Sequence, residues 1–66
     1  MRDPERIDLF LKKFGELWKE VPDWRFGQLV DNVMDFAEHE GAPNIFYIEE
    51  DDFQYYMDRF FKESDE

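Results

Sequence analysis

The sequence predicts a mainly α-helical fold, namely a compact three-helix domain with one short extended segment near residues 45–48. Apolar residues recur every three or four positions in three stretches, which is the spacing of one face of an α-helix. Pro22, Gly41 and Pro43 interrupt these stretches, because residues of these types end helices. We therefore expect one domain over residues 1–66, with helices at about 4–20, 24–39 and 51–63.

The first helix is predicted from its start, its apolar face and its end. Asp3 is a favourable N-cap residue, and Pro4 suits the first helical position. Pro22 ends the helix, since the residue before a proline avoids helical backbone angles. Gly15 lies at the edge of the apolar face, where a missing side chain lets another backbone approach. That face comprises Ile7, Phe10, Leu11, Phe14, Leu17, Trp18 and Val21.

The second helix is predicted to begin at about Trp24, with Asp23 as its N-cap. Gly41 suits the position just after the helix, and Pro43 prevents its continuation. Trp24 lies outside the apolar face, so it either folds back over Val21 or stands in solvent. The apolar face comprises Phe26, Leu29, Val30, Val33, Phe36 and Ala37.

The segment Ile45–Ile48 is short, β-branched and aromatic, and Pro43 and Asn44 precede it. This composition is typical of extended backbone. A lone strand lacks a ladder partner, and unpaired backbone groups are costly to bury. Two alternatives stay open: the segment lies across the helices with its polar groups in water, or it pairs with a second copy or a partner protein.

The third helix follows a run of four carboxylates, Glu49–Asp52, which the positive end of the helix dipole favours. The last residues, 63–66, are expected to fray. The apolar face comprises Phe53, Met57 and Phe60, flanked by Tyr56 and Phe61, with Tyr55 pointing away from it. Across the three helices, we expect the core to contain Phe14, Trp18, Phe26, Leu29, Val33, Phe36, Phe53 and Phe60.

The charge of the chain limits its partners. It carries 18 acidic residues against 8 basic ones, a net charge of −10, and 13 of its 66 residues are aromatic. Such a charge repels nucleic acid and anionic membranes and attracts basic surfaces. Residues 1–37 hold eight acids and six bases, whereas residues 38–66 hold ten acids and two bases. The sequence therefore predicts an acidic end suited to a basic partner; the alternative is that the acids only keep an aromatic-rich domain soluble.

No catalytic, cofactor-binding or metal-binding residues are predicted, so the protein is not expected to be an enzyme. His39 is the only histidine, and the single serine, Ser64, lies in the tail. Without cysteine or threonine, the usual Ser/His/Asp and Cys/His arrangements cannot be assembled. The run Glu49–Asp52 lacks the alternating spacing of a calcium loop. The segment Pro22–Phe36 occupies the place of a DNA-binding helix, but Arg25 is its only cation, so direct nucleic-acid binding is not expected.

The sequence also predicts a cytoplasmic location. Its N-terminal segment lacks the apolar run of a signal peptide, and no stretch approaches the roughly 20 apolar residues of a membrane span. The absence of cysteine fits a reducing compartment.

The leading functional prediction is a small acidic protein-binding module. In its sharpest form it is a phage-type inhibitor whose carboxylates mimic nucleic-acid phosphates and block a nucleic-acid-handling protein, such as a CRISPR or restriction component. The predicted protein-binding carboxylates are Glu38, Glu40, Glu49, Glu50, Asp51, Asp52 and Asp58. The predicted apolar anchors, which miss the helical faces, are Leu9, Trp24, Tyr47 and Tyr55. The alternative is a structural accessory protein that forms homo-oligomers, such as a homodimer through the exposed strand, while its acids only confer solubility.

Three sequence blocks, covering about a third of the chain in collinear order, carry a resemblance. They are Arg2–Ile7 (RDPERI), Pro22–Leu29 (PDWRFGQL) and Phe46–Asp52 (FYIEEDD). Together they resemble a family of small uncharacterised proteins of bacteria and their phages. The stretch from Glu38 to Asn44 is longer than in those relatives. The resemblance implies a small cytoplasmic accessory protein associated with phages, and it transfers no activity to particular residues.

Overall fold

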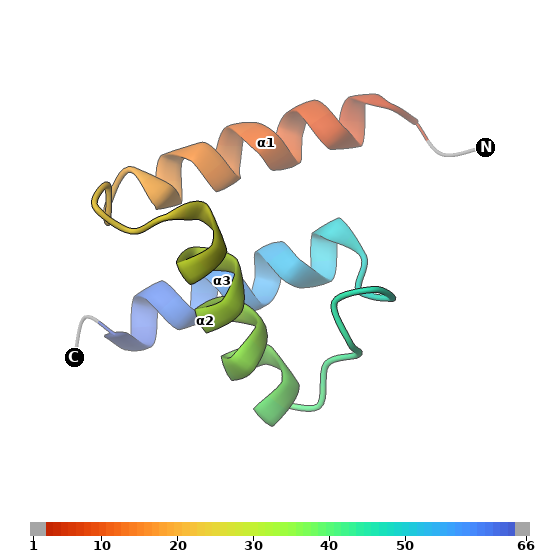
Figure 1. The fold of residues 1–66 in the computed structure, drawn as a ribbon. Helices are drawn as coiled ribbons and strands as arrows, with labels where there is room; N and C mark the ends of the chain where they lie inside the picture. The colour runs from red at the N-terminus through yellow and green to blue at the C-terminus, as the bar shows by residue number, and fades with distance from the viewer. Residues whose placement is uncertain (1–2, 65–66) are drawn as a thin grey trace.

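The structure is a computed structural model that describes residues 3–64. Over these residues the chain forms three helices and no strand, which confirms the predicted three-helix architecture (Figure 1). The helices are α1 (Glu5–Trp18), α2 (Phe26–His39) and α3 (Glu50–Ser64). Each boundary lies within two residues of the predicted one. Helix α3 includes the first half of the tail that was expected to fray; the other half, residues 65 and 66, lies outside the described residues.

Helix α1 begins as its sequence predicts. The carboxylate of Asp3 accepts a hydrogen bond of 2.9 Å from the backbone N–H of Glu5, and Pro4 already has helical angles. At the other end, the N–H groups of Glu20 and Val21 bond back to carbonyls of the last turn. The chain therefore leaves the helix through a tight turn.

Helix α2 begins two residues later than predicted, because Asp23 does not cap it. The side-chain oxygen of Gln28 instead accepts a hydrogen bond of 2.8 Å from the backbone N–H of Arg25, the residue before the helix. At the C-terminal end, Gly41 has φ 95°, and the N–H of Ala42 reaches the carbonyl of Ala37 at 2.9 Å. This arrangement is a Schellman motif, which requires the left-handed conformation that glycine adopts without strain.

Replacing Gly41 by alanine is expected to lower the free energy of unfolding by about 1 kcal/mol, because φ 95° is strained for a residue with a Cβ. Gly15 is the matched control, since it lies inside α1 and an added Cβ there meets no atom within 4 Å. Gly15→Ala is expected to stabilise the fold by up to about 1 kcal/mol. Urea unfolding of the two variants checks the opposite signs; a stabilised Gly41→Ala would contradict the cap.

The extended segment expected at residues 45–48 is not observed. Residues 45–47 form a turn, in which the carbonyl of Asn44 accepts hydrogen bonds from the N–H groups of Tyr47 (2.8 Å) and Ile48 (3.0 Å). The side chain of Asn44 also accepts a hydrogen bond of 2.9 Å from the N–H of Phe46. Asparagine thus satisfies the local backbone donors, and the β-propensity of the segment is overridden because no neighbouring strand supplies a ladder.

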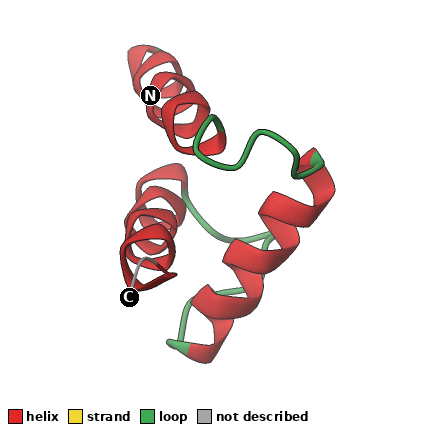
Figure 2. Cartoon of the chain, turned by 90° about the vertical axis from the view of Figure 1, so that its left-hand side faces the viewer, coloured by secondary structure: helices red, strands yellow, loops and turns green. Residues whose placement is uncertain are grey.

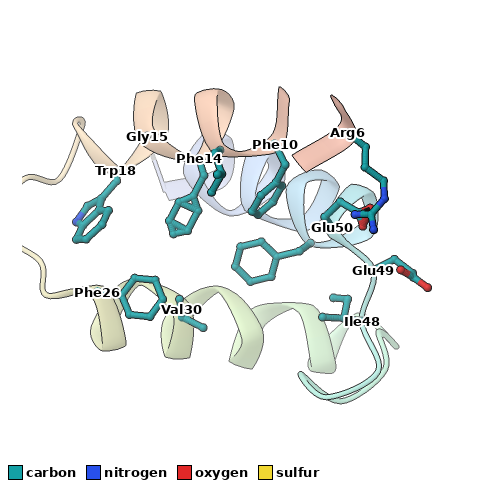
Figure 3. Close-up of a pocket in the computed structure, with 12 residues that line it drawn as sticks. Arg6, Phe10, Phe14, Gly15, Trp18, Phe26, Val30, Ile48, Glu49 and Glu50 are labelled. Atoms are coloured by element: carbon teal, nitrogen blue, oxygen red, sulfur yellow. Dashed lines mark hydrogen bonds and ion pairs between the residues drawn. The ribbon is translucent and has the colours of Figure 1, made fainter. Parts of the chain in front are cut away.

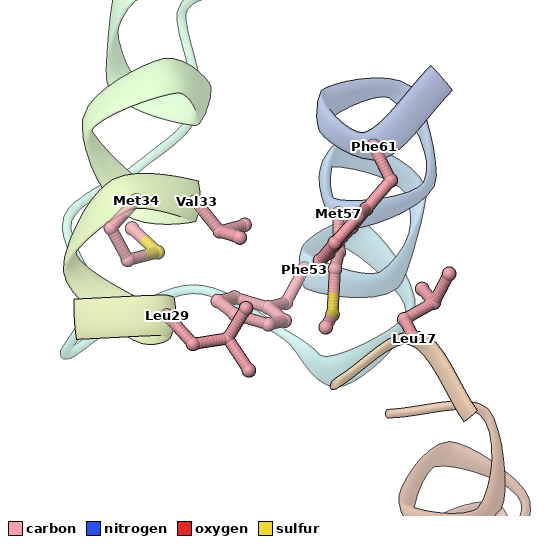
Figure 4. Packing of buried hydrophobic residues seen from close by; sticks show 7 residues of the cluster. All are labelled: Leu17, Leu29, Val33, Met34, Phe53, Met57 and Phe61. Atoms are coloured by element: carbon pink, nitrogen blue, oxygen red, sulfur yellow. The ribbon is translucent and has the colours of Figure 1, made fainter. Parts of the chain in front are cut away.

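Helix α3 organises the fold. It packs against both α1 and α2, whereas α1 and α2 contact each other much less. Helices α1 and α3 lie side by side and run in the same direction, and α2 crosses them (Figures 1 and 2). The buried cluster sits between the helices (Figure 4) and comprises Leu17, Leu29, Val33, Met34, Phe53, Met57 and Phe61. Among the described residues, no helix is both long and apolar enough to cross a membrane.

Candidate functional site: an apolar groove and an aromatic loop

An open groove of about 800 Å³ lies between α1 and α2. Helices α1 and α2 are its two sides (Figure 3), and α3 contributes Glu50 and Phe53. Its apolar lining consists of Phe10, Leu11, Phe14, Trp18, Phe26, Val30, Ile48 and Phe53. The groove exists because α1 and α2 each rest on α3 and leave the space between them unfilled.

Aromatic rings hold the groove together. Phe14 stacks on Phe53 with ring centroids 6.2 Å apart and an angle of 9° between the planes. Phe10 meets the same ring edge-on at 6.0 Å, and Phe26 of α2 stacks on Phe14 at 6.2 Å. Offset and edge-on pairs of this kind contribute about 0.5–1.5 kcal/mol each beyond the area that they bury. Residues from all three helices therefore form one continuous aromatic surface.

The exposure of Phe26 differs from the prediction that it belongs to the core. This residue was expected to be buried, but 59 % of its surface is exposed. Its ring lies against Phe14 and against Trp18, at a centroid distance of 5.9 Å to the latter, and its outer face opens into the groove. Ile7 and Leu11, on the same face of α1, are also exposed. The apolar face of α1 is thus wider than α3 alone can cover.

Trp24, predicted as a surface anchor, is half-buried and does not stand in solvent. Its ring packs against Phe60 and Phe61 at 6.2 and 6.5 Å, and its carbonyl accepts a hydrogen bond of 3.0 Å from the indole N–H of Trp18. The connection between α1 and α2 is therefore fastened to the core at Trp24. Most of the apolar surface of the Trp24 side chain therefore packs against the protein itself.

One end of the groove is charged. The guanidinium of Arg6 on α1 donates to the carboxylate of Glu50 on α3 at 2.7 Å, and Glu49 also lines this end. Both partners are partly shielded, with 38 % and 23 % of the two side chains exposed. The ion pair ties the start of α1 to the start of α3 beside the apolar lining.

The exposed aromatic loop consists of Ile45, Phe46 and Tyr47. Phe46 is 81 % exposed and Tyr47 73 %, and their rings meet edge-on at 5.0 Å. The sequence predicted Tyr47 as an anchor, and the turn at Asn44 presents Phe46 beside it. Phe46 was missed as a surface residue because the segment was expected to be extended.

The seven predicted carboxylates differ in their surroundings. Asp58 lies 3.7 Å from Lys13 of α1, whereas its neighbour Arg59 binds Glu40, just beyond α2, at 2.5 Å. Glu50 is bound to Arg6, so Glu40, Glu50 and Asp58 each form an ion pair with a cation within residues 3–64. Glu38, Asp51 and Asp52 are exposed, and Glu49 is half-buried.

The two remaining predicted anchors stand apart from the groove. Leu9 is 69 % exposed on the outer side of α1, as its position opposite the apolar face predicts. Tyr55 is 56 % exposed, and the guanidinium of Arg59 lies 5.7 Å from its ring centroid. Neither residue lines the groove.

His39 is the one histidine, and its pKa is raised above the ordinary value of 6.5. The main cause is the hydrogen bond of 2.7 Å from its ring Nδ1–H to the carbonyl of Asp35, followed by the charge of the Asp35 carboxylate. Protonated His39 therefore stabilises the fold, fully below about pH 6.5 and progressively less as the pH rises through the raised pKa.

An NMR titration of His39 is expected to give a midpoint above 6.5. Asp35→Asn should lower the midpoint without returning it fully to 6.5, because the variant removes the charge but keeps the backbone carbonyl. A wild-type midpoint at or below 6.5 would contradict the bond to Asp35.

Within residues 3–64, no group of three acidic or histidine side chains is placed to hold a metal ion. Of the carboxylates in Glu49–Asp52, Glu50 binds Arg6, whereas Asp51 and Asp52 are exposed. The arrangement offers apolar and aromatic contacts with acidic neighbours.

No protein-family model matches the chain, and neither curated proteins nor solved structures include one that is detectably similar to it. The resemblance of the three sequence blocks therefore stays a prediction.

Proposed function

We propose that the protein is a small acidic protein-binding module that holds a positively charged partner protein. The observation that carries the proposal is the grouping of exposed apolar side chains. Five of the exposed large apolar residues fall in two places: Leu11 and Phe26 line the groove, and Ile45, Phe46 and Tyr47 form the aromatic loop. Grouped exposure of this kind on a chain of charge −10 favours an interaction surface over the alternative that the acids only keep the protein soluble.

The charge selects among the classes of partner. Nucleic acid and anionic membranes are repelled by a net charge of −10, and a basic protein surface is attracted. Aromatic anchors combined with acidic neighbours would give such a complex both affinity and a fast, steered association. Binding, with no catalytic step, is the activity that we propose.

Phosphate mimicry is the narrower form of this proposal. In a phage-type inhibitor of a CRISPR or restriction component, exposed carboxylates would occupy the places of phosphates. Support for it comes from Glu38, Asp51 and Asp52, whose side chains are exposed. Glu40, Glu50 and Asp58 contribute less, because each is engaged by a cation of this chain.

The homo-oligomer has less support. It depended on an exposed strand between α2 and α3, and the described residues form a turn there. Two copies would also bring together two chains that each carry −10. Self-association is therefore an outcome that the experiments below must recognise, rather than a second proposal.

Neutralising Glu38, Asp51 and Asp52 together (Glu38→Gln, Asp51→Asn, Asp52→Asn) is expected to weaken retention of basic proteins from a host extract. The matched control neutralises three exposed carboxylates of the other half of the chain: Glu5→Gln, Glu16→Gln and Glu20→Gln. Bound proteins should elute as salt rises toward about 1 M, where charges are screened beyond about 3 Å. Retention that survives molar salt, or that both triple variants weaken equally, would contradict the proposed acidic surface.

A further inference from the structure

We propose that the groove between α1 and α2 binds an amphipathic helix of the partner protein, with apolar residues on one face and lysine or arginine along its flanks. This inference rests on the proposed function and deepens it, because it assigns the binding surface and the form of the partner segment.

The shape of the groove fits a helix. Its two sides are helices, and it is an open groove with a volume of about 800 Å³. A fourth helix laid between α1 and α2 would complete a bundle in which every apolar face is covered. The three helices alone leave part of the apolar faces of α1 and α2 uncovered, because both helices make most of their contacts with α3.

The spacing of the apolar residues on α1 also fits a helix, with Ile7 and Leu11 exposed and Phe14 and Trp18 half-buried. Ile7, Leu11, Phe14 and Trp18 are separated by four, three and four positions, which is the seam spacing of two helices that pack along each other. From Ile7 to Trp18 this seam is about 16 Å long, or three helical turns. A partner helix of about the same length would bury it.

The charged groups lie at one end of the groove, apart from most of its apolar lining, and this arrangement argues against a small polar ligand. The lining from Phe10 to Trp18 is apolar, and the charged groups gather at the end where Arg6 binds Glu50. Pockets for small molecules enclose most of the ligand and place polar groups against it. An elongated apolar surface with charge at its edge is the pattern of helix-in-groove recognition.

The net charge of the chain favours a basic helix. Around the groove itself the charges are of both signs: Arg6 lines it, and among the exposed neighbours of lining residues are the acids Glu16 and Asp31 and the bases Lys12 and Arg25. The net charge of −10 would nevertheless repel an acidic helix, including one from a second copy of this chain.

Gly15 offers a way to block the groove without harming the fold. It lines the groove on α1, and a Cβ added there meets no atom within 4 Å. Leucine also favours the helical state more than glycine does. The variant Gly15→Leu therefore fills part of the groove and should fold at least as well as the wild type. The control is Asn32→Leu, an exposed position of α2 that does not line the groove.

The probe is a synthetic amidated peptide of about 14 residues, with leucines at the seam spacing and lysines elsewhere. Its counterparts are a peptide with glutamate in place of lysine and a scrambled peptide of the same composition. Calorimetry measures affinity. Fluorescence of Trp18, recorded in the Trp24→Phe variant, reports whether the peptide occupies the groove, because Trp18 is then the only indole and it lines the groove.

We expect the basic peptide to bind and to shift the emission of Trp18, and we expect Gly15→Leu to weaken binding by about tenfold or more. Asn32→Leu should stay within about twofold of the wild type, and the acidic and scrambled peptides should not bind. The inference is overturned if the basic peptide does not bind, if Gly15→Leu leaves its affinity unchanged, or if the acidic peptide binds equally well. It is also overturned if sedimentation shows a wild-type dimer that Gly15→Leu dissociates, since a second copy would then fill the groove.

Failure of this inference can be told apart from failure of the proposed function. If Gly15→Leu retains basic host proteins as the wild type does, the module binds through another surface, such as the aromatic loop, and only the groove assignment is wrong. If neither form retains basic proteins and neither binds the peptide, both proposals fall.

Discussion

Replacing Leu29 by alanine is expected to lower the free energy of unfolding by about 3 kcal/mol. Leu29 has no exposed surface and lies in the buried cluster between α2 and α3. Truncation leaves a cavity that a tightly packed helix pair cannot fully close, so the cost exceeds the lost transfer free energy. A domain of this size has only about 3–5 kcal/mol of stability from its core. We therefore expect a large unfolded fraction at room temperature.

Urea unfolding followed by circular dichroism measures this effect. Leu9→Ala is the matched control, because Leu9 is 69 % exposed and the same atoms are removed; its effect should stay within about 0.5 kcal/mol. If Leu29→Ala proves too unfolded to analyse, Leu29→Met keeps the volume and should cost below about 1.5 kcal/mol. Equal stability of Leu29→Ala and Leu9→Ala would show that the cluster is not the core.

Phe53→Ala is expected to cost about 3 kcal/mol and to release α1 from the rest of the fold. The ring of Phe53 is 7 % exposed and is the main apolar contact between α3 and the rings of Phe10 and Phe14. Without it, α1 keeps only one residue of the buried cluster, Leu17, together with the ion pairs of Arg6 and Lys13, which are partly exposed and contribute little.

Hydrogen exchange gives the distinguishing measurement. Amides of α1 should lose protection more than those of α2 and α3, because the contact between α2 and α3 does not depend on Phe53 alone. The matched control is Phe46→Ala in the aromatic loop, where the ring is 81 % exposed and the change should stay within about 0.5 kcal/mol. A uniform loss of protection in all three helices would show that α1 is not a separately attached element.

The helices could be predicted from the sequence because their signals are local. Apolar spacing, the Asp3–Pro4 start and Gly41 each act within a few residues, and the structure has a helix where each stretch predicts one. The prediction of an extended conformation at residues 45–48 was wrong, because strand formation does not depend on local signals alone. The residue types of this segment favour strands, but a strand needs a partner, and Asn44 satisfies the backbone locally instead.

The groove could not be predicted, because it depends on how the helices are arranged rather than on where they form. The sequence shows that Phe14, Trp18 and Phe26 are apolar, but not that α1 and α2 leave a gap in which Phe26 is 59 % exposed. A usable signal existed in α1, whose apolar face is too wide for one neighbouring helix. Likewise, the ion pairs of Glu40, Glu50 and Asp58 join residues distant in sequence, so the sequence alone did not show that these carboxylates have partners within the chain.

The attachment of both groove walls to a single helix also has a mechanical consequence. Because α1 and α2 touch each other mainly at the ring of Phe26, the width of the groove between them depends on how each helix packs on α3. The ring of Phe53 lies at that contact, so in the proposed complex its size would affect how bulky a partner side chain the groove admits.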